Sequence, residues 1–122
     1  MNGKPHQQLE AWKISKDLVE DVYRVTATLP PHELYGLVSQ MRRAAVSISS
    51  NIAEGAARDG SREFAHFLSI ARGSISELDT QYQLATRLGF AKPESPHIDE
   101  LIERTSKLIS GLLRKTKEAA HP

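Results

Sequence analysis

The sequence predicts an all-α protein, an antiparallel up-down four-helix bundle, on three observations. Apolar residues recur every three to four positions along most of the chain, and no segment shows the strict alternation typical of strands. Three short segments that contain proline or glycine, near 30, 55–61 and 88–96, separate four such stretches. The connections are short, which makes successive helices antiparallel neighbours. We therefore expect one domain, 1–122, with helices at about 8–29, 31–55, 61–88 and 96–118.

The first helix is apolar over an unusually wide arc. A core-facing stripe is flanked by a second stripe, which consists of Leu9, Trp12, Val19 and Tyr23. Together they cover roughly 220°, against the ~100° or more that a surface helix usually buries. Either this helix lies deep in its own bundle or the second stripe contacts another subunit. On the second interpretation, Trp12, Val19 and Tyr23 are candidates for an oligomer face.

Pro30 and Pro31 mark the start of the second helix, because proline cannot continue a helix but suits its first turn. The apolar seam of this helix consists of Leu34, Leu37, Met41, Ala45, Ile48 and Ile52. A polar line runs along the margin of the seam, in an arc of about 80°, and consists of Arg43, Ser47, Asn51 and Glu54. Such groups need partners, since an unpaired buried polar group costs about 1–3 kcal/mol.

Two interpretations of this polar line stay open. It joins the second and third helices by hydrogen bonds, through Glu77, Gln81 or Arg72, or it lines a groove or a subunit contact. Catalysis is disfavoured, because Ser47 has no histidine at helical spacing that could act as its base.

The third helix has the most regular seam and a glycine in its middle. Asp59 and Ser61 are its possible N-caps, and Gly89 stands where a glycine often follows a helix end. The seam consists of Phe64, Leu68, Ala71, Ile75, Leu78, Tyr82 and Ala85. A stripe of small residues includes Gly73, which costs about 1 kcal/mol relative to alanine inside a helix. We expect another backbone to approach Gly73 closely, either within the chain or from a second subunit.

The fourth helix begins with Ser95 as N-cap and Pro96 as first helical residue. Acidic residues Asp99 and Glu100 favour its positive end, and basic residues follow near its negative end. Its seam consists of Ile98, Leu101, Ile102, Thr105, Leu108, Ile109 and Leu112.

Several function classes are disfavoured by composition. The chain has no cysteine, and its five histidines are scattered without metal-ligand spacing. We find no catalytic set, phosphate loop or di-iron motif, so we expect no enzyme, no cofactor, no metal and no small-molecule substrate. No secretory signal and no apolar run of ~20 residues is present. We therefore expect a cytoplasmic protein without a membrane partner.

Five arginines cluster in sequence around the second break, and they are Arg42, Arg43, Arg58, Arg62 and Arg72. The whole chain has a net charge of only +1, from 16 basic and 15 acidic residues. Salt bridges and a solvated face explain such a cluster. The alternative is contact with RNA or DNA, since a ring of copies would concentrate the charge against phosphate backbones.

Several segments together resemble a known family. They are Leu9–Lys13, Tyr35–Leu37, QMRRAAVSISSNIAEG at Gln40–Gly55, Glu63-Phe64, Phe67-Leu68, ARGSISEL at Ala71–Leu78, and Leu84–Phe90. This pattern is similar to the four-helix-bundle proteins whose founders are encoded by intervening sequences within bacterial 23S ribosomal RNA genes. The resemblance covers nearly the whole chain before the fourth helix.

The resemblance implies an antiparallel four-helix fold and a ring-shaped homopentamer. It also implies kinship with the accessory variability proteins of diversity-generating retroelements, which are basic pentamers that bind nucleic acid and partner a reverse transcriptase. The present chain differs from them in being almost neutral. We expect a non-enzymatic homo-oligomeric interaction or scaffold protein, and the alternative is a nucleic-acid-binding accessory protein that partners a reverse transcriptase.

Overall fold

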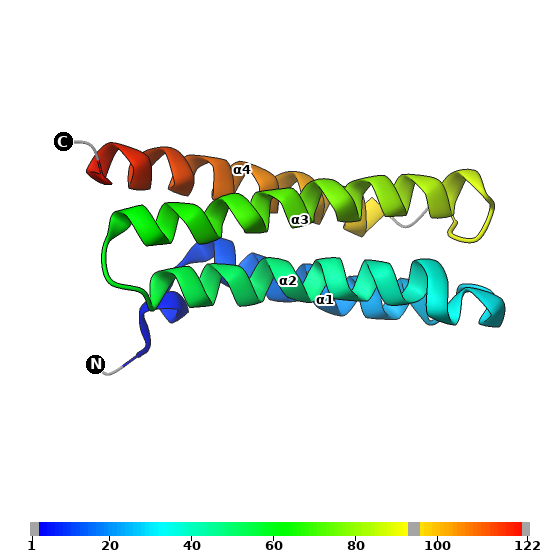
Figure 1. The fold of residues 1–122 in the computed structure, drawn as a ribbon. Helices are drawn as coiled ribbons and strands as arrows, with labels where there is room; N and C mark the ends of the chain where they lie inside the picture. The colour runs from blue at the N-terminus through cyan, green and yellow to red at the C-terminus, as the bar shows by residue number, and fades with distance from the viewer. Residues whose placement is uncertain (1–2, 93–95, 121–122) are drawn as a thin grey trace.

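Four long helices form an antiparallel bundle in a computed structural model that describes residues 3–92 and 96–120 (Figure 1). They are α1 (Glu10–Thr26), α2 (Ser39–Ala56), α3 (Ser61–Arg87) and α4 (Pro96–Ala120). Three short turns precede α1 and α2, namely η1 (Pro5–Gln8), η2 (Pro31–Glu33) and η3 (Leu34–Val38). The predicted all-α four-helix bundle is confirmed.

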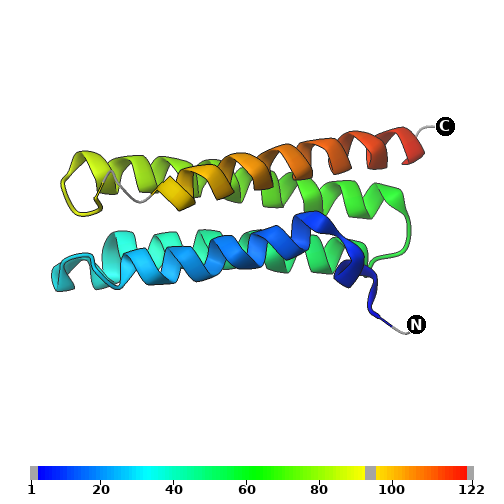
Figure 2. The ribbon, with the colours of Figure 1, turned by 180° about the vertical axis from the view of Figure 1, so that it is seen from behind.

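The helices close into a bundle in which each packs against the next and α4 packs back on α1. The most extensive pairing is between α2 and α3. Both ends of the chain and the α2–α3 loop lie at one end of the bundle, while the other two connections lie at the opposite end (Figures 1 and 2). Within the described residues, no helix is both long and apolar enough to cross a membrane.

The core consists of the seams that the apolar period predicts. Its largest fully buried side chains include Leu18, Met41, Ile48, Ile52, Leu68, Leu78, Ile98, Ile109 and Leu113. Complete burial of such a side chain contributes about 1.5–3 kcal/mol. The core also holds the hydroxyl of Thr105, whose Oγ1 has no hydrogen-bond partner among the described residues. Leu108 departs from the predicted seam and is exposed, since Ile109 and Leu113 occupy the core positions.

The first helix is shorter than expected, because α1 ends at Thr26 and not near 29. Thr28 and Leu29 donate their N–H groups to Val25 and Thr26 across three residues, which tightens the chain into a turn. The physical reason is Pro30, which disfavours helical geometry at the residue before it. Leu29 is nevertheless buried and still contributes to the core.

The second helix begins later than expected, at Ser39 and not at 31. A single turn (η2) is followed by a π-helical turn (η3), in which Gly36 adopts non-helical φ −110° and ψ −112°. The Glu33 carboxylate accepts a hydrogen bond from the Leu37 N–H at 3.2 Å and caps this turn. The kink rotates Leu34 out of the predicted seam, so that half of its surface is exposed to solvent.

The ends of α3 follow one prediction and correct another. Gly89 has φ +78°, and the N–H groups of Gly89 and Phe90 bond the carbonyls of Thr86 and Ala85. This pattern closes the helix in a Schellman motif and confirms the glycine stop. At the start of α3, the N-cap residue is Gly60 and not Asp59 or Ser61, and no side chain caps the helix. The predicted N-cap of α4, Ser95, lies outside the described residues.

Gly55 lies where α2 and α3 approach each other closely. It is buried inside α2, and an added Cβ would lie 2.7 Å from the Phe67 Cβ and 3.0 Å from the Phe64 Cδ1. Any larger residue would push the two helices apart. This contact holds α2 and α3 at the spacing that the rest of their interface requires.

Candidate interaction surface

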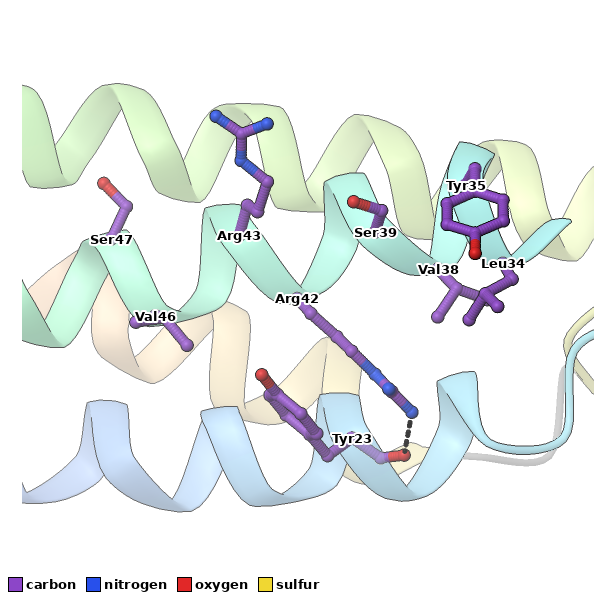
Figure 3. Close-up of a pocket in the computed structure, with 9 residues that line it drawn as sticks. All are labelled: Tyr23, Leu34, Tyr35, Val38, Ser39, Arg42, Arg43, Val46 and Ser47. Atoms are coloured by element: carbon purple, nitrogen blue, oxygen red, sulfur yellow. Dashed lines mark hydrogen bonds between the residues drawn. The ribbon is translucent and has the colours of Figure 1, made fainter.

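A groove about 660 Å³ in volume opens between α1, η3 and α2 (Figure 3). We call it the α1–α2 groove, and its lining consists of Tyr23, Leu34, Tyr35, Val38, Ser39, Arg42, Arg43, Val46 and Ser47. The lining combines apolar and aromatic side chains with two arginines and no carboxylate. This combination suits binding to another macromolecule better than it suits chemistry.

Exposed apolar side chains dominate this groove. Tyr35 is 92% exposed, Leu34 50%, Tyr23 43% and Val46 41%. Tyr35 and Leu34 lie at the start of η3, before the kink at Gly36, whereas Val38 at its end is buried in the core. Sequence reasoning missed Leu34, Tyr35 and Val46; the signal that could have found them is Gly36, which interrupts the helical pattern soon after two prolines.

Arg42 lies across the floor of the groove and joins α2 to α1. Its Nε donates to the Thr26 Oγ1 at 2.8 Å, and its Nη2 donates to the Tyr23 carbonyl at 3.4 Å (Figure 3). The guanidinium also lies 4.5 Å from the centre of the Tyr23 ring. A cation at these last carbonyls is stabilised by the negative end of the α1 dipole. The Arg42 guanidinium therefore binds α1 of its own chain.

The second apolar stripe of α1 does not meet one neighbour throughout, since Tyr23 lines the groove beside α2 and Leu9 lines a pocket beside α4. Leu9, Trp12 and Val19 are partly buried against the core, while Tyr23 is exposed in the groove. The Trp12 ring is covered by Lys16, whose Nζ lies 3.8 Å from the ring centre, and by the edge of His6 at 4.6 Å. The stripe is thus divided, because Trp12 and Val19 have neighbours within the chain and Tyr23 remains open.

The polar line of α2 connects to α3 through one residue that the sequence analysis did not name. The Ser47 Oγ lies 2.8 Å from the Oγ of Ser74, which is buried on α3. The Asn51 amide donates to the Ser47 carbonyl at 2.8 Å and to its Oγ at 2.9 Å. Hydrogen bonds therefore do join the two helices, but through Ser74 and not through Glu77, Gln81 or Arg72.

The two ends of the polar line behave differently. Glu54 pairs at 2.5 Å with Arg58, which lies just beyond the end of α2. Arg43 is exposed and also borders a small polar pocket, together with Gln40, Ala44, Ser47, Glu77 and Gln81. The Gln81 Oε1 in this pocket is buried without a hydrogen-bond partner among the described residues. The four residues of the line thus do not form one site.

The five candidate arginines are not brought together. Arg42 extends toward α1, whereas Arg43 points away from it, toward α3 (Figure 3). Arg58 pairs with Glu54 and Glu63 and lies 4.9 Å from the Phe67 ring centre. The hydrogen bond to Glu54 raises the pKa of Arg58 above its ordinary value. Within residues 3–92 and 96–120, Arg43, Arg62 and Arg72 form no ion pair, so they are the arginines free to meet an external anion.

Gly73 is exposed on α3, and an added Cβ there would meet no atom within 4 Å. The predicted close approach within the chain is therefore found at Gly55 instead.

A sequence model described as 23S rRNA-intervening sequence protein matches residues 7–111. No curated protein matches the chain.

Proposed function

Since this chain belongs to the 23S rRNA-intervening sequence protein family, we propose that it is a non-enzymatic, homo-oligomeric interaction protein, with five copies as the expected assembly. The observation that carries the proposal is the α1–α2 groove. Four large apolar side chains, those of Tyr23, Leu34, Tyr35 and Val46, are exposed along it. Contiguous exposed apolar surface of this kind marks protein interaction sites on soluble domains.

Assembly would remove this surface from water. Burial of apolar surface contributes about 25 cal/mol per Å², and rigid aromatic side chains such as Tyr35 are frequent anchors of interfaces. Tyr35 stands beside the non-helical Gly36, and its side chain is exposed to solvent. A second copy is therefore the proposed occupant of the groove.

The mass of the purified chain in solution, by size-exclusion chromatography with light scattering, tests this proposal. We expect Val46→Glu to lower the mass, because it places a charge in the covered groove. The matched control is Ile70→Glu, because Ile70 on α3 is 40% exposed and Val46 is 41% exposed. A lower mass only for Ile70→Glu would move the interface to the exposed face of α3 near Gly73. A monomeric unmodified chain would overturn the proposal.

Nucleic-acid binding is the second candidate function, and two observations favour it. Arg43, Arg62 and Arg72 have no ion pair among the described residues, and the exposed Tyr35 ring lines the same groove as Arg43. Aromatic rings beside arginines bind single-stranded nucleic acid by stacking and charge.

Titration of single-stranded and structured RNA at several salt concentrations tests this second function. Binding that weakens linearly with the logarithm of the salt concentration, and that falls in Tyr35→Ala, supports it. The absence of binding at low salt removes it.

A further inference from the structure

The charge of the α1–α2 groove shows how two copies can meet there. Its lining carries Arg42 and Arg43 and includes no aspartate or glutamate. In a two-fold symmetric contact, the same patch of both copies faces itself. The arginines of one copy would then lie against those of the other, which is unfavourable. The surface that enters this groove must therefore be a different and acidic one.

An acidic groove lies on the adjacent side of the bundle, between α1 and α4. It is lined by Ile14, Asp17, Glu20, Asp21, His97, Glu100, Leu101 and Arg104 and has a volume of about 370 Å³. Asp21 pairs with Arg24. In the part of the chain that the structure describes, Asp17, Glu20 and Glu100 have no ion-pair partner. These three carboxylates are available to an outside cation.

The two grooves overlap in level along the bundle. Tyr23 lines the α1–α2 groove and Asp21 lines the acidic groove, two residues apart on α1. With a rise of about 1.5 Å per residue, they differ in height by roughly 3 Å. Two copies with parallel axes can therefore bring the overlapping parts of the two grooves together.

We propose that the α1–α2 groove of one copy receives the acidic α1–α4 side of the next copy. This inference rests on the proposed homo-oligomer and names its two contact surfaces. Arg43 then faces the carboxylates of Asp17 and Glu100, while Tyr35 and Val46 are covered. The contact joins two different surfaces, so each copy keeps one free groove for a further neighbour.

The placement of the grooves on adjacent sides of the bundle is compatible with the closed ring that the family resemblance implies. Adjacent sides of a four-helix bundle face directions roughly 90° apart. A closed ring needs about 90° between the two contact directions for four copies and about 108° for five. A second acidic region, with Asp79, Asp99 and Glu103, lies between α3 and α4 on the opposite side of the bundle. This region is a less suitable partner for the α1–α2 groove, because contacts between opposite sides of the bundle would extend into an open chain of copies. In addition, Glu103 is already paired with Lys107.

Mixing two variants tests the pairing directly. The first, Arg43→Glu with Val46→Glu, blocks the α1–α2 groove; the second, Asp17→Arg with Glu100→Arg, blocks the acidic groove. Light scattering is expected to show each variant alone as a monomer of about 13.6 kDa. The equimolar mixture is expected to gain mass by joining unlike chains, because one unaltered contact remains between them and the two altered faces carry opposite charges. The control, Asp79→Arg with Asp99→Arg, is expected to keep the mass of the unmodified chain.

The outcomes separate this inference from the proposed function. Suppose that the unmodified chain is an oligomer. If the mixture then stays monomeric, or if the acidic-groove variant keeps the mass of the unmodified chain, the proposed pairing is wrong but the homo-oligomer stands. If the unmodified chain is a monomer, the proposed function itself fails. Circular dichroism checks that each variant is folded. If Asp17→Arg with Glu100→Arg unfolds, Asp17→Asn with Glu100→Gln replaces it. This milder variant is expected to dissociate at a higher protein concentration than the unmodified chain. Unchanged dissociation would contradict the pairing.

Discussion

Gly55 on α2 lies so close to Phe67 on α3 that a Cβ at Gly55 would be 2.7 Å from the Phe67 Cβ. Gly73, the glycine that the sequence singles out, has open space around the same position. The two glycines therefore have opposite roles: Gly55 sets the spacing of the two helices, and Gly73 leaves a gap on the surface.

We predict that Gly55→Ala destabilises the protein by about 1–2 kcal/mol. Overpacking costs about 1–3 kcal/mol, and the better helix propensity of alanine returns up to about 1 kcal/mol. Gly73→Ala, the matched control, is expected to stabilise the chain by about 0.5–1 kcal/mol, because only propensity changes. Urea unfolding at one protein concentration measures both. A stabilising Gly55→Ala would show that the helices are not in close contact there.

Thr105→Val is expected to stabilise the protein by about 1 kcal/mol. The Thr105 hydroxyl is fully buried, and no described residue bonds it, so its removal recovers a desolvation cost. Thr26→Val is the control and is expected to destabilise by about 1–2 kcal/mol, because the Thr26 Oγ1 bonds both Val22 and Arg42. Thermal unfolding distinguishes the two variants. Loss of stability in Thr105→Val would indicate that its hydroxyl has a partner.

The Ser47–Ser74 hydrogen bond is expected to couple α2 and α3. Each single change to alanine leaves the other hydroxyl without this partner, and should cost about 1 kcal/mol. The double variant is expected to lose less than the sum of the two, by about 0.5 kcal/mol or more. A double-mutant cycle in urea measures the coupling. Strictly additive losses would mean that the two serines do not depend on each other.

Arg42→Ala is expected to destabilise the protein by about 1–3 kcal/mol, because it removes hydrogen bonds to Thr26 and to the last turn of α1. Arg72→Ala is expected to stay within about 0.5 kcal/mol of the unmodified chain, since Arg72 is exposed and forms no ion pair among the described residues. The free energies of unfolding in urea provide the comparison. Equal losses of stability in the two variants would show that the contacts of Arg42 with α1 do not stabilise the fold.

The bundle, its core and the stop at Gly89 could be predicted from the sequence, because helical apolar period and glycine stops are local signals. The groove could not. It depends on the turn at Gly36, which exposes Leu34 and Tyr35 against the apolar pattern. The pairing of Ser47 with Ser74 depends on how α2 and α3 align, and a single-helix projection does not contain that alignment.

The roles of the arginines also needed the structure. Arg42 and Arg43 are neighbours in sequence, yet one is bound to the end of α1 and the other is exposed beside α3. Adjacent residues on a helix point about 100° apart, so sequence proximity alone does not create a basic patch.

The central claim is that copies of this chain assemble into a homo-oligomer. Sedimentation equilibrium of the unmodified chain at micromolar concentrations tests it most directly. The account predicts a mass of several times 13.6 kDa, with five copies expected. A single species of 13.6 kDa across that concentration range would contradict it.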